Sequence, residues 1–410
     1  MLSVASEANK NEVYSYLKLL NDSEISFIFI SFFICAPAAF FKPKNVFRRT
    51  KTLIYGLFVL SVYPNFISPT FYWAQSTFLE KRFIRQESIL FHPQTSGHSP
   101  ENILFIIGES HRFKEFIRYF PSDKFKNLIL FDDYISVHHH TTPALQSLLF
   151  RKKLSHINRI HEKSLISLFN EAGYDTYFLS YLKKEDGSQA AFSGEATHFI
   201  NYSKGEKPDD IDLLAILKKL LSKNEKKLIV VKMIGVHFNF EDRYPPEYDV
   251  LRPSMQSSKI DPEAKNKETL LNTYKNAMSY SGNIIEHIVE MIENTQKSTL
   301  MSFSSDHGLC IYDNRLYILP DCKNAFHIPW FIAFNDAFAK QADTERMKTL
   351  RSRMHSPLTA EFVFETLVSL SGLTYPDADL RFDATHPEAV VQTPRKVKAL
   401  SMMPVSYENL

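Results

Sequence analysis

The sequence predicts an α/β fold: a mostly parallel sheet with helices on both faces, preceded by a short transmembrane helical hairpin. After residue 100, strand-like apolar runs alternate with helix-like segments, which is the pattern of βαβ units. Several of these runs are apolar throughout, as strands covered on both faces are. Two long runs without a charged residue come before them, at residues 25–41 and 53–73.

The two uncharged runs predict a membrane anchor. Residues 25–41 are at the lower limit of length for crossing a bilayer, and residues 53–73 exceed it. A pair of buried core helices is the alternative. The short loop between the runs is basic, which favours its retention in the cytoplasm and the export of the chain after the second run. Its charged residues are Lys42, Lys44, Arg48, Arg49 and Lys51.

These features divide the chain into three expected parts. Residues 1–78 form a membrane anchor with two transmembrane helices. Residues 79–100 form a linker, which ends in a stretch containing Pro, Gly, Ser and Thr. Residues 101–410 form a globular domain in the periplasm, so the expected location is a bacterial inner membrane.

Composition excludes two classes of protein. The 410 residues carry 48 basic and 46 acidic side chains, so we expect no nucleic acid or other bulk electrostatic partner. Three cysteines are too few for a disulfide-dense scaffold. Cys310 and Cys322 both lie on the exported side and could form a disulfide. Cys35 lies in the first uncharged run and should stay free.

The elements of the globular domain follow in the order of an α/β protein. The continuous apolar run at 102–107 is expected to be a central strand. The other expected strands are 131–137, 174–179, 227–234, 298–303 and 327–334. The expected helices are 144–150, 164–172, 211–221, 269–292 and 360–370, and the tail after Asp379 is expected to be loop.

Potential metal ligands stand where three of these strands end. Glu109 follows the first strand, and His237 follows the strand at 227–234. Asp306 and His307 follow the strand at 298–303. In an α/β sheet ligands bind beyond the carboxyl ends of the strands, and carboxylate oxygen with imidazole nitrogen suits zinc. Glu109 could instead cap the helix that follows it.

A pair of threonines opens the helix predicted around residue 144. Pro143 fits the first turn of that helix, with Thr141 or Thr142 as its N-cap. A hydroxyl at a helix N-terminus is placed to meet a phosphate, and it can act as a nucleophile if a metal lowers its pKa. A plain capping threonine is the alternative. Of the histidines at 138–140, we expect His140 to reach the site, unless this run is a solvated loop.

Four segments in this order resemble the alkaline-phosphatase/sulfatase superfamily, and more narrowly the bacterial phosphoethanolamine transferases. They are residues 103–110 (ILFIIGES), 141–145 (TTPAL), 274–290 (YKNAMSYSGNIIEHIVE) and 303–308 (FSSDHG). His237 with residues 243–245 (RYP), and residues 326–329 (FHIP), resemble two further family segments. The resemblance covers residues 101–372 and implies a sulfatase-like catalytic domain.

The resemblance also implies roles for individual residues. It makes Thr141, rather than Thr142, the nucleophile and His237 a residue on the substrate side. A second metal or a phosphate oxygen could be held by His237, His327 or His140. The zinc ligands that it implies are Glu109, Thr141, Asp306 and His307.

The implied reaction is a zinc-dependent transfer of phosphoethanolamine through a phospho-threonine. The donor is a phospholipid, phosphatidylethanolamine above all, and the acceptor is an envelope glycan such as lipid A or the lipopolysaccharide core. Departures from the family pattern leave a second metal open: residues 316–320 (LYILP) stand where the family often has a His-Gly, and Leu309-Cys310 replaces its Glu-Ser.

Three other functions remain open from the sequence. A sulfatase needs an arginine after the nucleophile segment, which Thr141–Leu145 lacks. A glycerol-phosphate transferase is barely distinguishable by sequence. A catalytically degenerate envelope scaffold is the non-enzyme alternative, and zinc content would separate it from the enzymes.

Overall fold

The computed structural model describes the globular part of the chain. The residues it describes are 90–151, 164–184, 189–203, 207–258, 266–311, 322–391, 393–398 and 404–410. The expected membrane anchor at 1–78, with Cys35, lies outside these ranges. Within the part that is described, no helix is both long and apolar enough to cross a membrane.

A seven-stranded sheet forms the centre of the domain, in the order β3-β9-β8-β2-β7-β5-β6. All neighbours from β8 to β6 are parallel, and only β9 runs against the others. The predicted mostly parallel sheet is therefore confirmed, with one antiparallel strand. The strands are β2 (Asn102–Gly108), β3 (Leu128–Phe131), β5 (Asp175–Ser180), β6 (His198–Asn201), β7 (Lys227–Lys232), β8 (Thr299–Ser305) and β9 (Trp330–Phe334).

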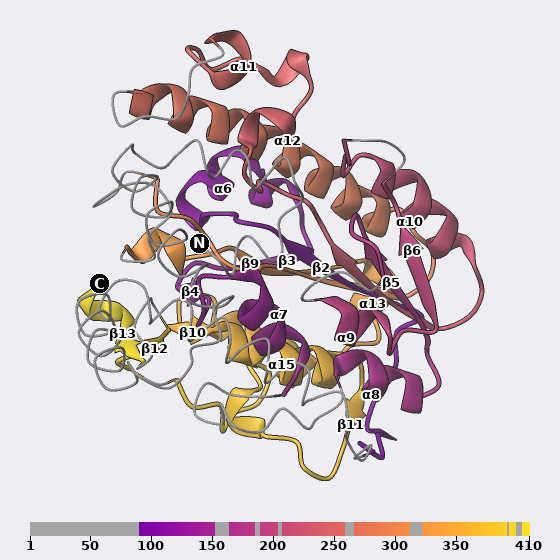
Figure 1. The fold of residues 1–410 in the computed structure, drawn as a ribbon. Helices are drawn as coiled ribbons and strands as arrows, with labels where there is room; N and C mark the ends of the chain where they lie inside the picture. Colours follow the sequence, from indigo (N-terminus) through magenta and orange to yellow (C-terminus); the bar gives the residue numbers. More distant parts are fainter. Residues whose placement is uncertain are drawn as a thin grey trace, which may run out of the picture. The chain divides into compact units, whose positions relative to one another are not determined.

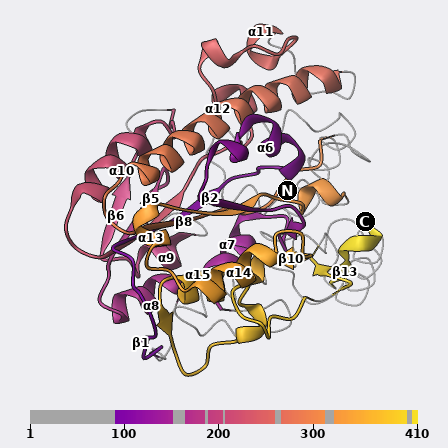
Figure 2. The ribbon, with the colours of Figure 1, turned by 180° about the vertical axis from the view of Figure 1, so that it is seen from behind.

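Helices cover both faces of this sheet (Figure 1). One face carries α6 (Phe113–Tyr119), α10 (Asp212–Ser222) and α12 (Lys267–Glu293), with α11 (Met255–Ser258) packed on α12. The opposite face carries α7 (Thr141–Leu149), α8 (Leu165–Glu171), α9 (Ala190–Ser193) and α15 (Val363–Leu370). The view from behind adds α14 (Thr344–Ser352) beside α15, and α13 (Asp336–Ala339) follows β9 (Figure 2).

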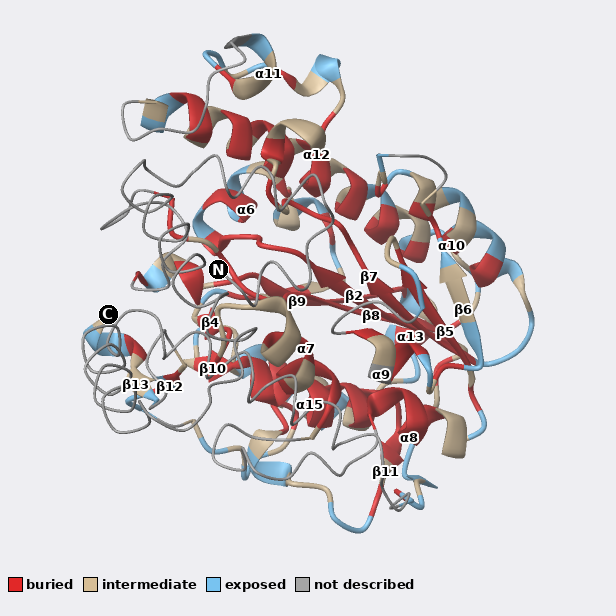
Figure 3. Ribbon diagram, in the orientation of Figure 1, coloured by how far each residue is buried: buried red, intermediate tan, exposed pale blue. Residues whose placement is uncertain are grey.

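The central strands are buried along their whole length (Figure 3). Alternate side chains of β2 point to opposite faces, so Ile103, Phe105 and Ile107 join the core under α7 and α15. Leu104 and Ile106 are also fully buried, on the other face. This double burial is why the strand reads as one continuous apolar run.

The expected helices at 164–172, 211–221 and 269–292 are confirmed within two residues at their ends, as α8, α10 and α12. The other two are confirmed but begin elsewhere: α7 starts at Thr141, three residues before 144, and α15 starts at Val363, after a 3-10 turn at 360–362. Ser164 caps α8, since its hydroxyl accepts a hydrogen bond from the amide of Ile166. Gly173 ends that helix with a φ of 81°, which favours glycine. The sequence patterns gave no indication of the edge strand β6 or of the helices α6, α9, α11, α13 and α14.

Two of the expected strands were wrong in extent. Residues 131–137 are not one strand: β3 ends at Phe131, and β4 (Tyr134–Ile135) pairs with β10 (Leu358–Thr359) outside the main sheet. Asp132 and Asp133 form the bend between them, as aspartates often do. The last strand begins at Trp330 rather than at 327, directly after Pro329.

Smaller elements complete the chain. The pair β1 (Gln94–Thr95) and β11 (Leu373–Thr374) is antiparallel. The tail, expected to be loop, contains the short antiparallel pair β12 (Lys396–Val397) and β13 (Val405–Ser406). Cys310 and Cys322 form the predicted disulfide.

Candidate metal and nucleophile site

Three neighbouring strands end at the same place on the sheet. β2 lies between β8 and β7 and is parallel to both. Glu109 follows β2, Asp306 and His307 follow β8, and Lys232 is the last residue of β7. Parallel strands bring their carboxyl ends to one edge, so residues far apart in the sequence meet here.

Backbone contacts hold these strand ends together. The amide of Asp306 donates to the carbonyl of Gly108, and the amide of Val236 donates to the carbonyl of Glu109. The hydroxyl of Tyr274, on α12, donates to the carbonyl of Ser110 at 2.8 Å. Ser110 has a φ of 62°, so the chain turns sharply after Glu109.

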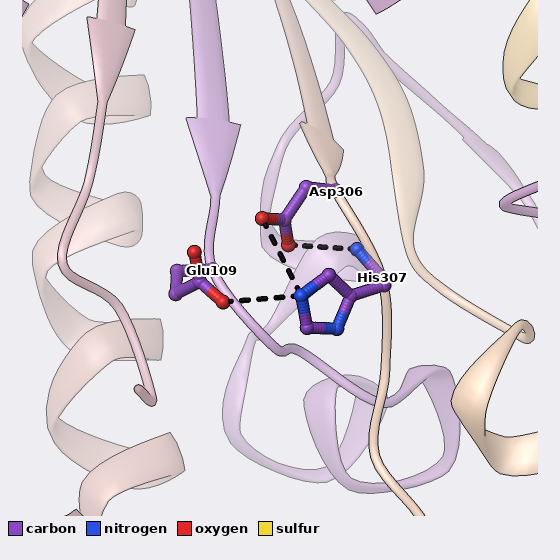
Figure 4. Close-up of side chains that lie close together, drawn as sticks. All are labelled: Glu109, Asp306 and His307. Atoms are coloured by element: carbon purple, nitrogen blue, oxygen red, sulfur yellow. Dashed lines mark hydrogen bonds and ion pairs between the residues drawn. The ribbon is translucent and has the colours of Figure 1, made fainter. Parts of the chain in front are cut away.

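Glu109, Asp306 and His307 form a buried cluster with the chemistry of a metal site (Figure 4). One ligand atom of each lies within 4.8 Å of the others. The Nε2 of His307 is 3.4 Å from Oε1 of Glu109 and 3.8 Å from Oδ2 of Asp306. Its Nδ1 lies 2.8 Å from the carbonyl oxygen of Gly308. Because a carbonyl only accepts, Nδ1 carries the proton and the Nε2 lone pair faces the carboxylates, which fits zinc.

Thr141 contacts two members of this cluster through its side-chain hydroxyl. Its Oγ1 lies 3.2 Å from Oε2 of Glu109 and 3.2 Å from Nε2 of His307. The expectation that a threonine is the N-cap is wrong: His140 is the N-cap of α7 and Thr141 is the first helical residue. The Thr141 hydroxyl therefore points to the two ligands and does not cap the helix. The Thr142 hydroxyl is buried and has no hydrogen-bond partner among the described residues.

Lys232 is a member of the site that the sequence motifs did not reveal. Its ammonium nitrogen lies 2.6 Å from Oε2 of Glu109 and 3.1 Å from Oδ2 of Asp306. The side chain is buried. A signal was present in the sequence, because a lysine ending a wholly apolar strand needs an anionic partner, and Glu109 and Asp306 end neighbouring strands.

Burial and neighbouring charges together shift the pKa values of Glu109, Asp306 and Lys232. Burial by itself would raise the pKa of Glu109, but the charge of Lys232 above all brings it well below its ordinary value. Burial, reinforced by the charge of Glu109, raises the pKa of Asp306. Burial opposes the charge on Lys232, yet the two carboxylates outweigh it and raise the pKa of the ammonium. Glu109 and Lys232 are therefore an ion pair, and a further cation would favour the ionised form of Asp306 as well.

The three other predicted histidines, His237, His140 and His327, each have contacts of their own. The Nδ1 of His237 lies 2.6 Å from the carbonyl oxygen of Phe238, in the loop after β7. The ring of His140 packs on that of His139, with centroids 3.8 Å apart, and burial keeps the pKa of His140 well below its ordinary value.

His327 is directed elsewhere. Its ring stacks on Phe113 at 4.5 Å, and its Nε2 lies 2.9 Å from the carbonyl oxygen of Asp132. In the described ranges the cluster of possible metal ligands consists of Glu109, Asp306 and His307, without His327. These contacts give His327 a packing role beside β4.

Comparison with known proteins supports this fold. The family model described as Sulfatase matches residues 101–373. The phosphoethanolamine transferase EptA of Helicobacter pylori is 25% identical over 307 residues, which are 68% of this chain and 55% of that protein. The chain thus spans about half the length of that curated relative.

Two solved structures share the fold at low identity. The periplasmic domain of EptC from Escherichia coli, solved in complex with zinc, has a TM-score of 0.69 and 18% identity, covering 80% of this chain and 98% of that one. The membrane protein lipooligosaccharide phosphoethanolamine transferase A of Neisseria meningitidis has a TM-score of 0.72 and 17% identity, covering 94% of this chain and 81% of that one.

Proposed function

The chain belongs to the sulfatase family, and from this premise we propose that it is a zinc-dependent phosphoethanolamine transferase. The donor is phosphatidylethanolamine, and the acceptor is an envelope glycan such as lipid A or the lipopolysaccharide core. The relatives named for this reaction support the choice. The observation that carries the proposal is the Thr141 hydroxyl, 3.2 Å from both Glu109 and His307 at the start of a helix.

Glu109, Asp306 and His307, with Thr141, would hold one zinc ion. Bound there, zinc supplies a Lewis acid that lowers the pKa of a hydroxyl and polarises a phosphoryl oxygen. The residues fit this ion because they offer carboxylate oxygens and a bare imidazole nitrogen in a buried site. We propose no second metal.

Thr141 is the nucleophile in this scheme. Its hydroxyl gives up its proton to water, its oxygen forms a bond to the phosphorus of the lipid, and the bond from phosphorus to the diacylglycerol oxygen breaks. His237 gives a proton to the leaving oxygen as general acid. The backbone amides at the start of α7 face the phosphoryl group, where the helix dipole favours negative charge. A hydroxyl or phosphate of the acceptor then attacks phosphorus, the bond from phosphorus to the Thr141 oxygen breaks, and that oxygen regains a proton from water. His237 regains its proton from the attacking hydroxyl, or from water when a phosphate attacks.

The proposed setting is the bacterial inner membrane, with residues 1–78 as anchor, 79–100 as linker and 101–410 as the catalytic domain in the periplasm. The Cys310–Cys322 disulfide supports an oxidising compartment. An anchor in the membrane would also keep the domain next to a lipid donor.

The proposal is tested with the full chain in mixed detergent micelles. Each micelle preparation contains either phosphatidylethanolamine or phosphatidylglycerol, and released diacylglycerol is measured with zinc present. We expect release from phosphatidylethanolamine, loss of release in Thr141→Ala and retention in Thr142→Ala. Diacylglycerol release from phosphatidylglycerol alone would contradict phosphatidylethanolamine as the donor. Release from neither lipid would contradict the proposed transferase activity.

A further inference from the structure

We propose that Lys232 is a built-in counter-cation that positions Glu109 and Asp306 and limits the site to one divalent metal ion. This inference rests on the metal site of the proposed function, and it concerns a residue for which neither the sequence motifs nor the comparisons give a role. Lys232 is a positioning residue here, because it acts through the two carboxylates.

The geometry places the ammonium between two anions. It lies 2.6 Å from Oε2 of Glu109 and 3.1 Å from Oδ2 of Asp306. Thr141 Oγ1 lies 3.2 Å from that same Oε2, and His307 Nε2 lies 3.4 Å from Oε1 of Glu109. Each carboxylate oxygen has two lone pairs, so an oxygen that accepts from Lys232 keeps a second lone pair for a metal. The lysine thus bridges the two carboxylates, and the lone pairs that it does not use stay available to the ion.

The backbone of Lys232 fixes this position. Lys232 pairs with Ile107 in the parallel ladder between β7 and β2, two residues before Glu109. The hydroxyl oxygen of Tyr202 lies 3.3 Å from the carbonyl oxygen of Lys232, and the next amide, of Met233, donates to the carbonyl of Ile107. A charge at the end of a rigid central strand cannot move aside when a second cation approaches.

Charge balance explains the expected stoichiometry. Two buried carboxylates without a cation repel each other, and a buried charge that loses its partner is strongly destabilising. With Lys232 the group carries one net negative charge, and one divalent ion turns this into one net positive charge. One net positive charge attracts an anionic phosphoryl substrate. It repels a second divalent ion, because no further carboxylate in the cluster would balance that ion's charge.

The same strand supplies a matched control. Lys227 is the first residue of β7 and is also buried. Its ammonium donates to neutral oxygens: Oδ1 of Asn102 at 3.1 Å and the carbonyls of Lys223 and Glu225 at 3.0 and 2.5 Å. At about 3.3 Å per residue along the strand, the Cα atoms of Lys227 and Lys232 are roughly 16 Å apart. Replacing it removes a buried ammonium without touching the carboxylates.

The experiment compares wild type, Lys232→Met and Lys227→Met as full chains in detergent. Each is stripped of metal and then loaded with zinc, and the melting temperature and the zinc content per chain are measured. We expect one zinc per chain in wild type. Lys232→Met should melt at least roughly 5 °C lower without metal, and zinc should raise its melting temperature more than it raises that of wild type. Lys227→Met should lower the melting temperature by about the same amount with and without zinc.

The outcomes separate this inference from the function. An equal zinc-induced rise in the melting temperatures of Lys232→Met and wild type would overturn the role of Lys232, and so would two zinc ions bound per wild-type chain. Either result, if lipid cleavage persists, would leave the proposed function intact. Absence of zinc from the wild type would overturn both. If Lys232→Met cannot be purified, Lys232→Arg keeps the charge: it should bind zinc as wild type does, and failure to bind would contradict a counter-cation role.

Discussion

Two adjacent threonines show how local surroundings separate residues that look alike in sequence. Thr141 Oγ1 contacts Glu109 and His307, while the Thr142 hydroxyl is buried with no hydrogen-bond partner in the described part of the chain. The preference for Thr141 as nucleophile came from a family resemblance, and the geometry gives it a separate support. Neighbouring positions on a helix point about 100° apart, so only one of the two can face the carboxylates.

Buried histidines should make the stability of the protein depend on pH. Burial lowers the pKa of His111 to about 3 and that of His139 to about 4, from an ordinary value of 6.5. The unfolded chain therefore binds protons at these groups below pH 6.5 that the folded chain does not bind. The free energy of unfolding should fall as pH drops from about 6.5 towards 4, and it should not depend on these groups above pH 7.

The measurement is thermal unfolding of the metal-free full chain at a series of pH values. His111→Phe removes one of these groups and should flatten the fall in stability below pH 6.5. His92→Asn is the control, because His92 is exposed and should leave the slope unchanged. An identical slope in His111→Phe and wild type would contradict the assignment of a neutral, buried His111.

The role of Lys232 is the feature of the site that could not be predicted from single residues. The strand that carries it was predicted, and so were the two carboxylates that it contacts. The sequence does not state which strands are neighbours, however, and the order β8-β2-β7 is what brings the three groups together. Pairing of strands through long crossovers depends on the whole fold, so the ion pair could only be seen in the structure.

The loop after β7 is the element that joins His237 to the metal cluster. Asp210 is buried and accepts hydrogen bonds from the amides of Ile234 and Gly235, at 3.0 and 2.8 Å, and from the hydroxyl of Tyr202 at 2.6 Å. Gly235 has a φ of 50°, and a Cβ there would lie 2.8 Å from the backbone nitrogen and oxygen of Glu109. The loop is therefore packed directly on the chain segment that carries a proposed zinc ligand.

Gly235→Ala should damage both stability and the site. A left-handed backbone disfavours alanine by about 1–3 kcal/mol, and the added Cβ must push the backbone of Glu109 away. We expect weaker zinc binding and less diacylglycerol release. Gly173→Ala is the matched control: Gly173 has a φ of 81° and no atom within 4 Å of the added Cβ. It should lower stability without changing zinc affinity, and equal zinc affinity in both variants would refute the proposed coupling.

Helices and central strands were predictable because their patterns are local. The apolar run at β2 and the amphipathic repeat of α12 each identify one element without knowledge of its neighbours. The direction of β9 was not predictable in this way, since a short apolar strand reads the same in a parallel and in an antiparallel pair. Its reversal is seen only in the antiparallel ladders that it forms with β8 and β3.

At the scale of the whole molecule, the Cys310–Cys322 disulfide connects the metal cluster to β9. Cys310 lies three residues after His307, and Cys322 lies shortly before β9. A bridge over a separation of 12 residues stabilises a fold by about 2–4 kcal/mol, chiefly by restricting the unfolded chain. The paired Cys310→Ser and Cys322→Ser variant should lose about this much, measured by denaturant unfolding.

Thiol labelling checks the bridge independently. The chain has three cysteines, and two of them form the disulfide, so one thiol should react when the unreduced protein is alkylated in denaturant. All three should react after reduction. Three labelled thiols without reduction would show that the bridge does not form in the purified protein, and would remove a support for a periplasmic location.

The most direct test of the central claim is the intact mass of the full chain purified with its native phospholipids. We predict that a fraction of the wild-type protein carries the added mass of one phosphoethanolamine, that Thr142→Ala retains this increment, and that Thr141→Ala lacks it. An increment that persists in Thr141→Ala would contradict the assigned nucleophile. A zinc-loaded wild type that acquires no increment from phosphatidylethanolamine would contradict the proposed transfer itself.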